Sequence, residues 1–345
     1  VIEASDHSLW ATGYVTSYTP AGRAKVVLVG INSDCTELTC ARAGKLADNW
    51  HVYGYDLCQV FDTDGFCVIG NVVDHDLLGN DQRILLAKFD TSPGFLWARR
   101  FGDFDRDRTL SANAIIRTSD QCLAFAGDMS YWDGIYMDYG GFIVKTDPNA
   151  HFAWGREAPG FAHYSSATIG DLIETQDQAI VVTGHSYDFQ HEPSERVLLS
   201  KFNFGGSVIW NSGYDCGDDA FGFAVAESWD GYLVLGGATS GYGAGSSDCL
   251  IAACTPSGHT CLETLDGHGY NPWSPAEVEI TLQDAVDIVQ TTNWSPLLMV
   301  TPMDRTAICA PRVLTVGSCE EAPTFGSIQE AIDADEPFAQ SADIR

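Results

Sequence analysis

The chain has 345 residues, 45% of them hydrophobic, and its 47 acidic and 18 basic residues give a net charge of −29. Such an acidic surface argues against nucleic acid and anionic membranes as partners, because it would repel their phosphate groups. Membrane insertion is also excluded, because no run of about 18 apolar residues is present to cross a bilayer.

The composition predicts an all-β protein from an oxidising compartment. The 34 glycines and the short apolar runs are typical of strands joined by tight turns. Eleven cysteines without a CxxC pair favour disulfides, and therefore a secreted or cell-surface location. The sequon at Asn293 predicts glycosylation in that setting. A strand-like pattern starts at Val1, as we expect after removal of a leader peptide.

From the N-terminus onward, one strand–turn–strand pattern recurs six times. Each copy has an apolar strand, a turn with an acidic or amide anchor, and a second apolar run that usually ends in glycine. The copies are "IEASDHSLWATG" (2–13), "FDTDGFCVIG" (61–70), "IRTSDQCLAFAG" (116–127), "IETQDQAIVVTG" (173–184), "AESWDGYLVLGG" (226–237) and "QTTNWSPLLMV" (290–300). The anchors recur every 53 to 63 residues and are Asp6, Asp64, Asp120, Asp177, Asp230 and Asn293.

A third and a fourth strand follow in each repeat. In three repeats a lysine and a tryptophan stand nine residues apart: Lys88 and Trp97, Lys145 and Trp154, and Lys201 and Trp210. This constant separation indicates a hairpin with a fixed turn and register. The strands are apolar on both faces, so each sheet needs a neighbour on either side, which radial stacking supplies.

We therefore predict an all-β fold, a six-bladed β-propeller of four-stranded antiparallel blades. The propeller is expected over residues 1–320, with an extra strand and a tail over residues 321–345. The six repeats are expected to start near residues 1, 58, 112, 169, 222 and 283.

The repeat also resembles a known group. Its pattern of D-G-x-[LV]-x-G, then [LV]-x-K-x-[DN], then tryptophan is similar to that of secreted bacterial and microbial-eukaryote β-propellers, often found in surface proteins. The resemblance covers roughly residues 1–265 and is clearest over 60–240. It implies a fold and a surface setting rather than an activity. The first, fifth and sixth repeats depart from the pattern because they lack the lysine and the tryptophan.

Cysteine pairs flank turns where their Cβ atoms can come within disulfide range. The expected pairs at the turn between third and fourth strands are Cys35–Cys40, Cys254–Cys261 and Cys309–Cys319. The same reasoning pairs Cys58 with Cys67 in the first hairpin of the second repeat, and Cys216 with Cys249 across adjacent repeats. Cys122 is left over as a buried free thiol, with an intermolecular bridge as the alternative.

Aromatic and acidic side chains gather in loops expected on one face of the ring. Aromatic rings beside carboxylates can stack on sugars, although such loops also pack on one another. The glycan-binding candidates are Tyr131, Trp132, Tyr136, Tyr139 and Trp273. The alternating Asp103, Asp105 and Asp107 offer oxygen ligands for calcium but lack the rest of an EF-hand loop, so a solvated loop is the alternative. No other cofactor is expected.

A seventh copy of the first-strand sequence, "FGSIQEAID" (325–333), stands near the C-terminus with no further strand after it. Its characteristic residues are Phe325, Ile328, Glu330, Ile332 and Asp333. The copy could close its own ring, lie outside it as a stray edge strand, or enter a neighbouring molecule, where main-chain hydrogen bonds would hold it.

The function we expect is that of a non-enzymatic extracellular structural or adhesive protein. A strand donor at one end and an acceptor at the other would link copies head to tail into a filament or matrix. The alternative is a monomeric secreted propeller that binds a glycan or a protein. No G-x-S-x-G, HExxH or P-loop motif occurs, and no pair of carboxylates is singled out for glycoside hydrolysis, so an enzyme is the weakest candidate.

Overall fold

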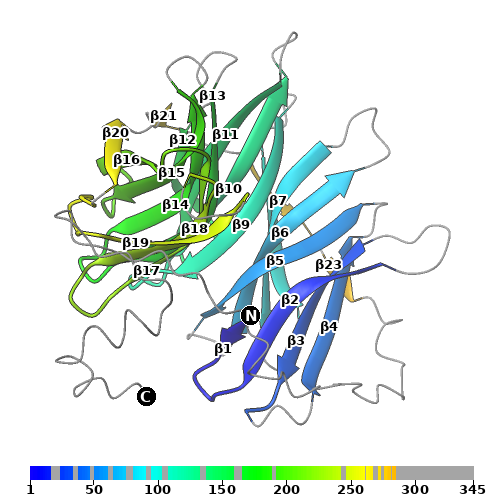
Figure 1. Ribbon diagram of the computed structural model, residues 1–345. Helices are drawn as coiled ribbons and strands as arrows, with labels where there is room; N and C mark the ends of the chain where they lie inside the picture. The colour runs from blue at the N-terminus through cyan, green and yellow to red at the C-terminus, as the bar shows by residue number, and fades with distance from the viewer. Residues whose placement is uncertain are drawn as a thin grey trace.

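A computed structural model shows an all-β protein in which antiparallel sheets follow one another in chain order (Figure 1). No helix in the described part of the chain is long and apolar enough to span a bilayer. The structure describes residues 1–16, 24–33, 38–46, 50–60, 65–74, 81–90, 95–102, 108–132, 137–158, 165–188, 192–241, 246–260, 262–266, 271–272, 276–280 and 282–284.

Four consecutive strands form each of the first four sheets, which confirms the predicted four-stranded antiparallel sheets. The first sheet contains β1 (Ile2–Glu3), β2 (Leu9–Thr16), β3 (Ala24–Ile31) and β4 (Leu38–Leu46). The second contains β5 (His51–Val60), β6 (Gly65–Asp74), β7 (Asp81–Asp90) and β8 (Phe95–Gly102). The third contains β9 (Arg108–Arg117), β10 (Leu123–Trp132), β11 (Met137–Thr146) and β12 (Phe152–Ala158).

The fourth sheet repeats this arrangement and the fifth departs from it. The fourth contains β13 (Ser165–Glu174), β14 (Ile180–Asp188), β15 (Glu192–Phe202) and β16 (Val208–Asp215). The fifth has three strands within the described residues: β17 (Ala220–Glu227), β18 (Leu233–Thr239) and β19 (Asp248–Cys254). The first strands of the second to fifth sheets are β5, β9, β13 and β17. Each packs against the next, and they are called the inner strands below.

Apolar side chains fill the space between consecutive sheets. Separate clusters join the first sheet to the second, the second to the third, the third to the fourth and the fourth to the fifth. Leu86 on one sheet and Phe125 on the next, for example, are both fully buried in one cluster. Because both faces of a middle sheet are covered, its strands read as continuous apolar runs. This explains why the repeats lack the polar–apolar alternation of a half-exposed sheet.

The repeat lysine holds the first turn of its own sheet. Lys145 Nζ donates to Asp120 Oδ2 at 2.9 Å, and Lys201 Nζ donates to Asp177 Oδ2 at 2.8 Å. Burial alone would raise the pKa of Asp120, but hydrogen bonds from Thr118 and Lys145 outweigh it and hold this pKa at about 2. The anchor carboxylate therefore remains ionised and paired at neutral pH.

The repeat tryptophan reaches the next sheet. Trp154 Nε1 donates to the carbonyl oxygen of Phe204 at 3.1 Å, and Trp210 Nε1 donates to that of Pro256 at the same distance. Both acceptors lie in the turn that follows the third strand of the following sheet. The lysine and the tryptophan thus have different roles: the first acts within a sheet and the second between sheets.

The chain after the fifth sheet takes an unexpected course along the outer strands. Its short strands are β20 (Glu263–Asp266), β21 (Asn271–Pro272), β22 (Ala276–Ile280) and β23 (Leu282–Asp284). They pair with β16, β12, β8 and β4 in turn, so each becomes the fifth strand of an earlier sheet. We call these four short strands, β20 to β23, the outer belt. The segment expected to be the fourth strand of repeat five therefore lies on the fourth sheet, because a bare outer edge offers unpaired N–H and C=O groups.

Candidate functional site

A glycine occupies the same position in the second strand of every sheet: Gly13, Gly70, Gly127, Gly184 and Gly237. In the second to fifth sheets a Cβ at this glycine would overlap a backbone carbonyl oxygen of the inner strand. The oxygens belong to Tyr53, Ser111, Thr168 and Phe221. The repeat ends in glycine because the inner strand crosses it at a distance that no side chain allows.

The register of each inner strand shifts by one residue close to this crossing. The shifts lie between Gly54 and Asp56, next to Gly127, between Ile169 and Asp171, and between Gly222 and Ala224. Such bulges bend a strand and increase its twist. Four sheets therefore share one local geometry, in which a bulged inner strand presses its backbone onto a glycine.

The first sheet differs at this position. β1 pairs only through Ile2 and Glu3, which lie opposite Trp10 and Leu9. In the second, third and fourth sheets the inner strand instead continues along the glycine and beyond it. A Cβ placed on Gly13 meets no atom of the described residues within 4 Å. We call residues 11–16 on this side the inner edge of β2; within the described residues it pairs with no strand.

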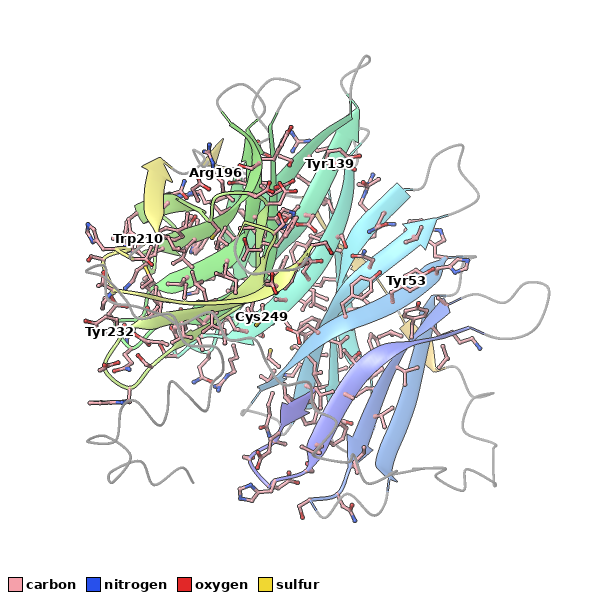
Figure 2. The ribbon with its side chains drawn as sticks, viewed as in Figure 1. Tyr53, Tyr139, Arg196, Trp210, Tyr232 and Cys249 are labelled. Carbon is pink, nitrogen blue, oxygen red and sulfur yellow. The ribbon has the colours of Figure 1, made fainter. Side chains whose placement is uncertain are left out.

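The inner edge of β2 has the properties of a strand acceptor. Its other side is fully paired with β3, from Leu9 opposite Ile31 to Thr16 opposite Ala24, so its backbone is already extended. Unpaired N–H and C=O groups on such an edge are a template for another strand. Tyr14, which is 53% exposed, borders it and meets the ring of Tyr53 edge-on at 4.8 Å. Tyr53 projects from β5 (Figure 2).

Three carboxylates near the inner strands support the backbone of the next sheet. Asp56 accepts the N–H of Ile115, and Asp171 accepts the N–H of Val225, both at 2.9 Å. Asp128 accepts the N–H of Ile169 at 2.9 Å as well. Burial raises the pKa of each of these acids. Their partners are structural, and no group of three or more potential metal-ligating side chains occurs among the described residues.

Glu195 is the described acid with the most altered titration near neutral pH. Its side chain is half-buried, its N–H donates to Asp219 Oδ1 at 2.9 Å, and burial together with the charge of Asp219 raises its pKa to about 7. Since the folded pKa lies above the unfolded value, folding favours the protonated acid. The contribution of Glu195 to stability is complete below the unfolded pKa and is lost as the pH rises through 7.

We therefore expect Glu195→Gln to stabilise the protein at pH 8 and to change little at pH 5. After allowance for solvent screening of this half-buried group, the gain at pH 8 should be about 1 kcal/mol. Urea unfolding of both proteins at the two pH values measures it. An equal effect at both pH values would show that the amide acts through packing rather than through the charge.

The aromatic glycan candidates are only partly within the described residues. Tyr139 lies on β11, is 52% exposed and faces Ser130 across the strand pair (Figure 2). Tyr131 and Trp132 are the last residues of β10, opposite Asp138 and Met137. The backbone thus brings Tyr131, Trp132 and Tyr139 to one end of the third sheet. The other two candidates, Tyr136 and Trp273, lie outside the described residues.

Several other predicted sites also fall outside the described residues. These are the calcium candidates Asp103, Asp105 and Asp107, the sequon at Asn293, and the C-terminal strand residues Phe325, Ile328, Glu330, Ile332 and Asp333. The same holds for Cys35, Cys261, Cys309 and Cys319, and for the side chain of Cys40 on β4.

The first expected disulfide within the described residues is not formed. Cys58 and Cys67 face each other across β5 and β6 as predicted, but both are buried free thiols. Burial raises the pKa of Cys67 to about 12, which disfavours the thiolate that disulfide exchange requires. Cys122, expected to be a buried free thiol, is free but half-buried.

The second expected disulfide is not formed either. Cys216 and Cys249 are free, as is Cys254. Cys216 and Cys254 belong to the core between the fourth and fifth sheets, whereas Cys249 is exposed on the opposite face of β19 (Figure 2). Alternate side chains of a strand point to opposite faces, and the pairing predicted from loop sides did not consider that Cys249 lies within a strand.

The glycine row and the inner edge of β2 are the features that the repeat pattern contained but did not explain. The glycine is visible in the alignment of the repeats; its reason, the crossing of the inner strand, is visible only in the structure. The sequence also gives no sign that β1 is short, since "IEASD" matches the other copies well.

Comparison with known proteins assigns no family. No family model matches the sequence, and no curated protein matches it. Among solved structures, the crystal structure of a mutant of puromycin hydrolase complexed with PGG is similar to 74% of this chain, with 12% sequence identity and a TM-score of 0.45. The matched part is 37% of the length of that protein. At this TM-score the similarity assigns neither a fold family nor an activity to the chain.

Proposed function

We propose that the chain is an extracellular structural or adhesive protein, a six-bladed propeller whose copies join head to tail by adding a strand to the inner edge of β2. The open space at Gly13 is the observation that supports this proposal. An inner strand covers the equivalent glycine in the second to fifth sheets. In the first sheet the same position is also a glycine, Gly13, but no described strand covers it. Strand addition there would give the first sheet the geometry of the others.

The C-terminal copy has the residues that an inner strand needs. Aligned on the anchor, Ile328 corresponds to Ile115, Leu172 and Val225, all of which are buried. Such an apolar residue would point into the core between sheets. The copy is thus matched to the inner position at a residue that is buried in the third, fourth and fifth sheets.

Glu330 matches a second inner-strand role. It aligns with Glu174 and Glu227. These two carboxylates accept the N–H groups of Ser119 and Gln176, in the first turn of the preceding sheet, at 2.6 and 2.7 Å. Charge-assisted bonds of this kind are stronger than neutral ones and would help to select the register of the added strand.

Composition supports the proposed location, and the positions of donor and acceptor support the proposed type of assembly. The acidic composition, with a net charge of −29, supports a soluble extracellular subunit. Donor and acceptor are different surfaces of one chain, so their contact is heterologous and extends into a filament unless its rotation closes a ring.

A second candidate is a monomeric binding module in which the C-terminal copy fills the inner edge of β2 of its own chain. The exposed aromatic residue Tyr139, close to Tyr131 and Trp132 at one end of the third sheet, favours a glycan or protein ligand for this form.

Ile328→Pro tests the proposal, because proline removes a strand N–H and disrupts the added strand. We expect the wild-type chain to form concentration-dependent oligomers in size-exclusion chromatography with light scattering, and the variant to be a monomer. Ile344→Pro, a matched change outside the copy, should still assemble. If the wild type is itself a monomer, head-to-tail linkage is refuted; a lower melting temperature of Ile328→Pro would then support closure within the chain.

A further inference from the structure

One apolar position is exposed in the fifth sheet and buried in the four other sheets. It lies on the third strand, opposite the residue that precedes the repeat glycine, and is occupied by Leu28, Leu86, Ile143, Leu199 and Ile251. The first four are at most 1% exposed, because the next sheet covers them, whereas Ile251 is 57% exposed. The fifth sheet has the residue for a further junction, but no described residue covers it.

The whole outward face of the fifth sheet shares this character. Its other face belongs to the core formed with the fourth sheet. On the outward face, Val234 is 38% exposed, and Ala253 and Cys249 are exposed on either side of Ile251. None of these side chains is charged. Val234 corresponds to Val181 of the fourth sheet, which is fully buried against the fifth. Burying an apolar face of this kind against other apolar side chains would stabilise the protein.

The outer belt carries the chain from the fifth sheet back to the first sheet. It passes the fourth, third, second and first sheets in that order and adds no strand to β19. Its last described residue, Asp284, lies opposite Gly44 on the outer strand of the first sheet. Residues 285–320 continue from that point, and this stretch is about as long as residues 220–254, which form the three strands of the fifth sheet.

The composition of residues 285–320 suits an apolar face. Their runs "SPLLMV" (295–300) and "RVLTV" (312–316) are strongly apolar in a chain that is otherwise acidic. The charged residues of the stretch are Asp287, Asp304, Arg305, Arg312 and Glu320, which gives it nearly equal numbers of acids and bases. Because it is tethered to the same molecule, it meets the face at a high effective concentration.

We propose that residues 285–320 of the same chain dock on the outward face of the fifth sheet, with Val234 and Ile251 at the centre of the contact. This docking covers the outward face of the fifth sheet, as the next sheet covers each of the first four. It rests on the six-bladed ring of the proposed function but not on the head-to-tail linkage, which involves the first sheet. The occupant is this chain's own segment and not a second copy.

Photo-crosslinking in the full-length protein tests the proposal. Ile251→p-benzoylphenylalanine places a photoreactive group on an exposed position of the face, and the same substitution at Ile209, which is 52% exposed on β16, is the control. We expect Ile251 to crosslink within the monomer to a peptide from residues 285–320, and Ile209 not to do so. Mixing ¹⁵N-labelled and unlabelled protein distinguishes crosslinks within one molecule from those between two.

Two results would overturn the docking: a crosslink from Ile251 to a second copy, or recovery of no crosslinked peptide from residues 285–320. Repeating the experiment in the Ile328→Pro variant separates the two proposals. Crosslinks that persist in a monomeric variant support both. Loss of assembly without any crosslink to residues 285–320 leaves the head-to-tail linkage intact and refutes only the docking.

Discussion

A Gly184→Val chain is expected to yield almost no soluble folded protein. A Cβ at Gly184 would overlap the carbonyl oxygen of Thr168, and it would lie 2.8 Å from the Thr168 carbonyl carbon and 3.0 Å from Ile169 Cα. All three are backbone atoms of an inner strand that is paired on one side and packed against neighbouring sheets. The strand cannot move without breaking these contacts, so we expect a loss of at least about 3 kcal/mol in the free energy of unfolding.

Soluble yield and the urea midpoint measure this effect. Gly184→Ala should already lower the midpoint, because the Cβ alone makes the overlap, and valine should be worse than alanine. A Gly184→Val protein with a wild-type midpoint would show that the inner strand does not cross the glycine as closely as described. The matched positions Gly70, Gly127 and Gly237 should respond in the same way, since each meets an inner-strand carbonyl oxygen.

For Gly13→Val we expect the opposite pattern: a folded protein that has lost its ability to assemble. The substituted side chain finds open space in the single chain, and β-branched residues favour strands, so the urea midpoint should equal or slightly exceed that of the wild type. An added inner strand, however, would clash with the valine side chain. The four native inner strands would clash in the same way with a Cβ on their own glycines. Oligomers should therefore be absent at every protein concentration.

Size-exclusion chromatography with light scattering, together with urea unfolding, decides the result. Gly13→Ser is the milder companion and should weaken assembly rather than abolish it. Normal assembly of Gly13→Val would refute strand addition at the inner edge of β2. A large loss of stability in a monomeric wild-type background would instead show that the chain's own C-terminal copy occupies this edge, which is the second candidate function.

The repeat pattern predicted the strands because the apolar runs, the turns and the lysine–tryptophan separation all indicated the same four strands. Apolar runs separated by turns specified four strands per repeat, and the nine-residue separation of Lys145 and Trp154 specified the register of their hairpin. These are local relations between residues close in the chain. The all-β class and the four-stranded antiparallel sheets followed from them and are present in the structure.

The features that matter for function depend on contacts between distant residues. In the outer belt, Asp266 pairs with Ser212 and Asp284 pairs with Gly44. No sequence pattern near these residues predicts these pairings. Cys249 and Cys216 fell on different faces because alternation along β19 outweighed their similar loop positions. The exposure of Ile251 also has no local signal, because it is an aliphatic residue like the buried Leu199 at the equivalent position of the sheet before it.

By itself, the sequence determined the class of fold, the four strands of a repeat and the glycine at the end of its second strand, because these depend on short-range periodicity and turn chemistry. The tertiary structure alone decided which of five equivalent glycines lacks an inner strand and which of five equivalent apolar residues lacks a cover. Copies of one repeat have nearly the same local preferences, so only their neighbours in space can distinguish a closed junction from an open one.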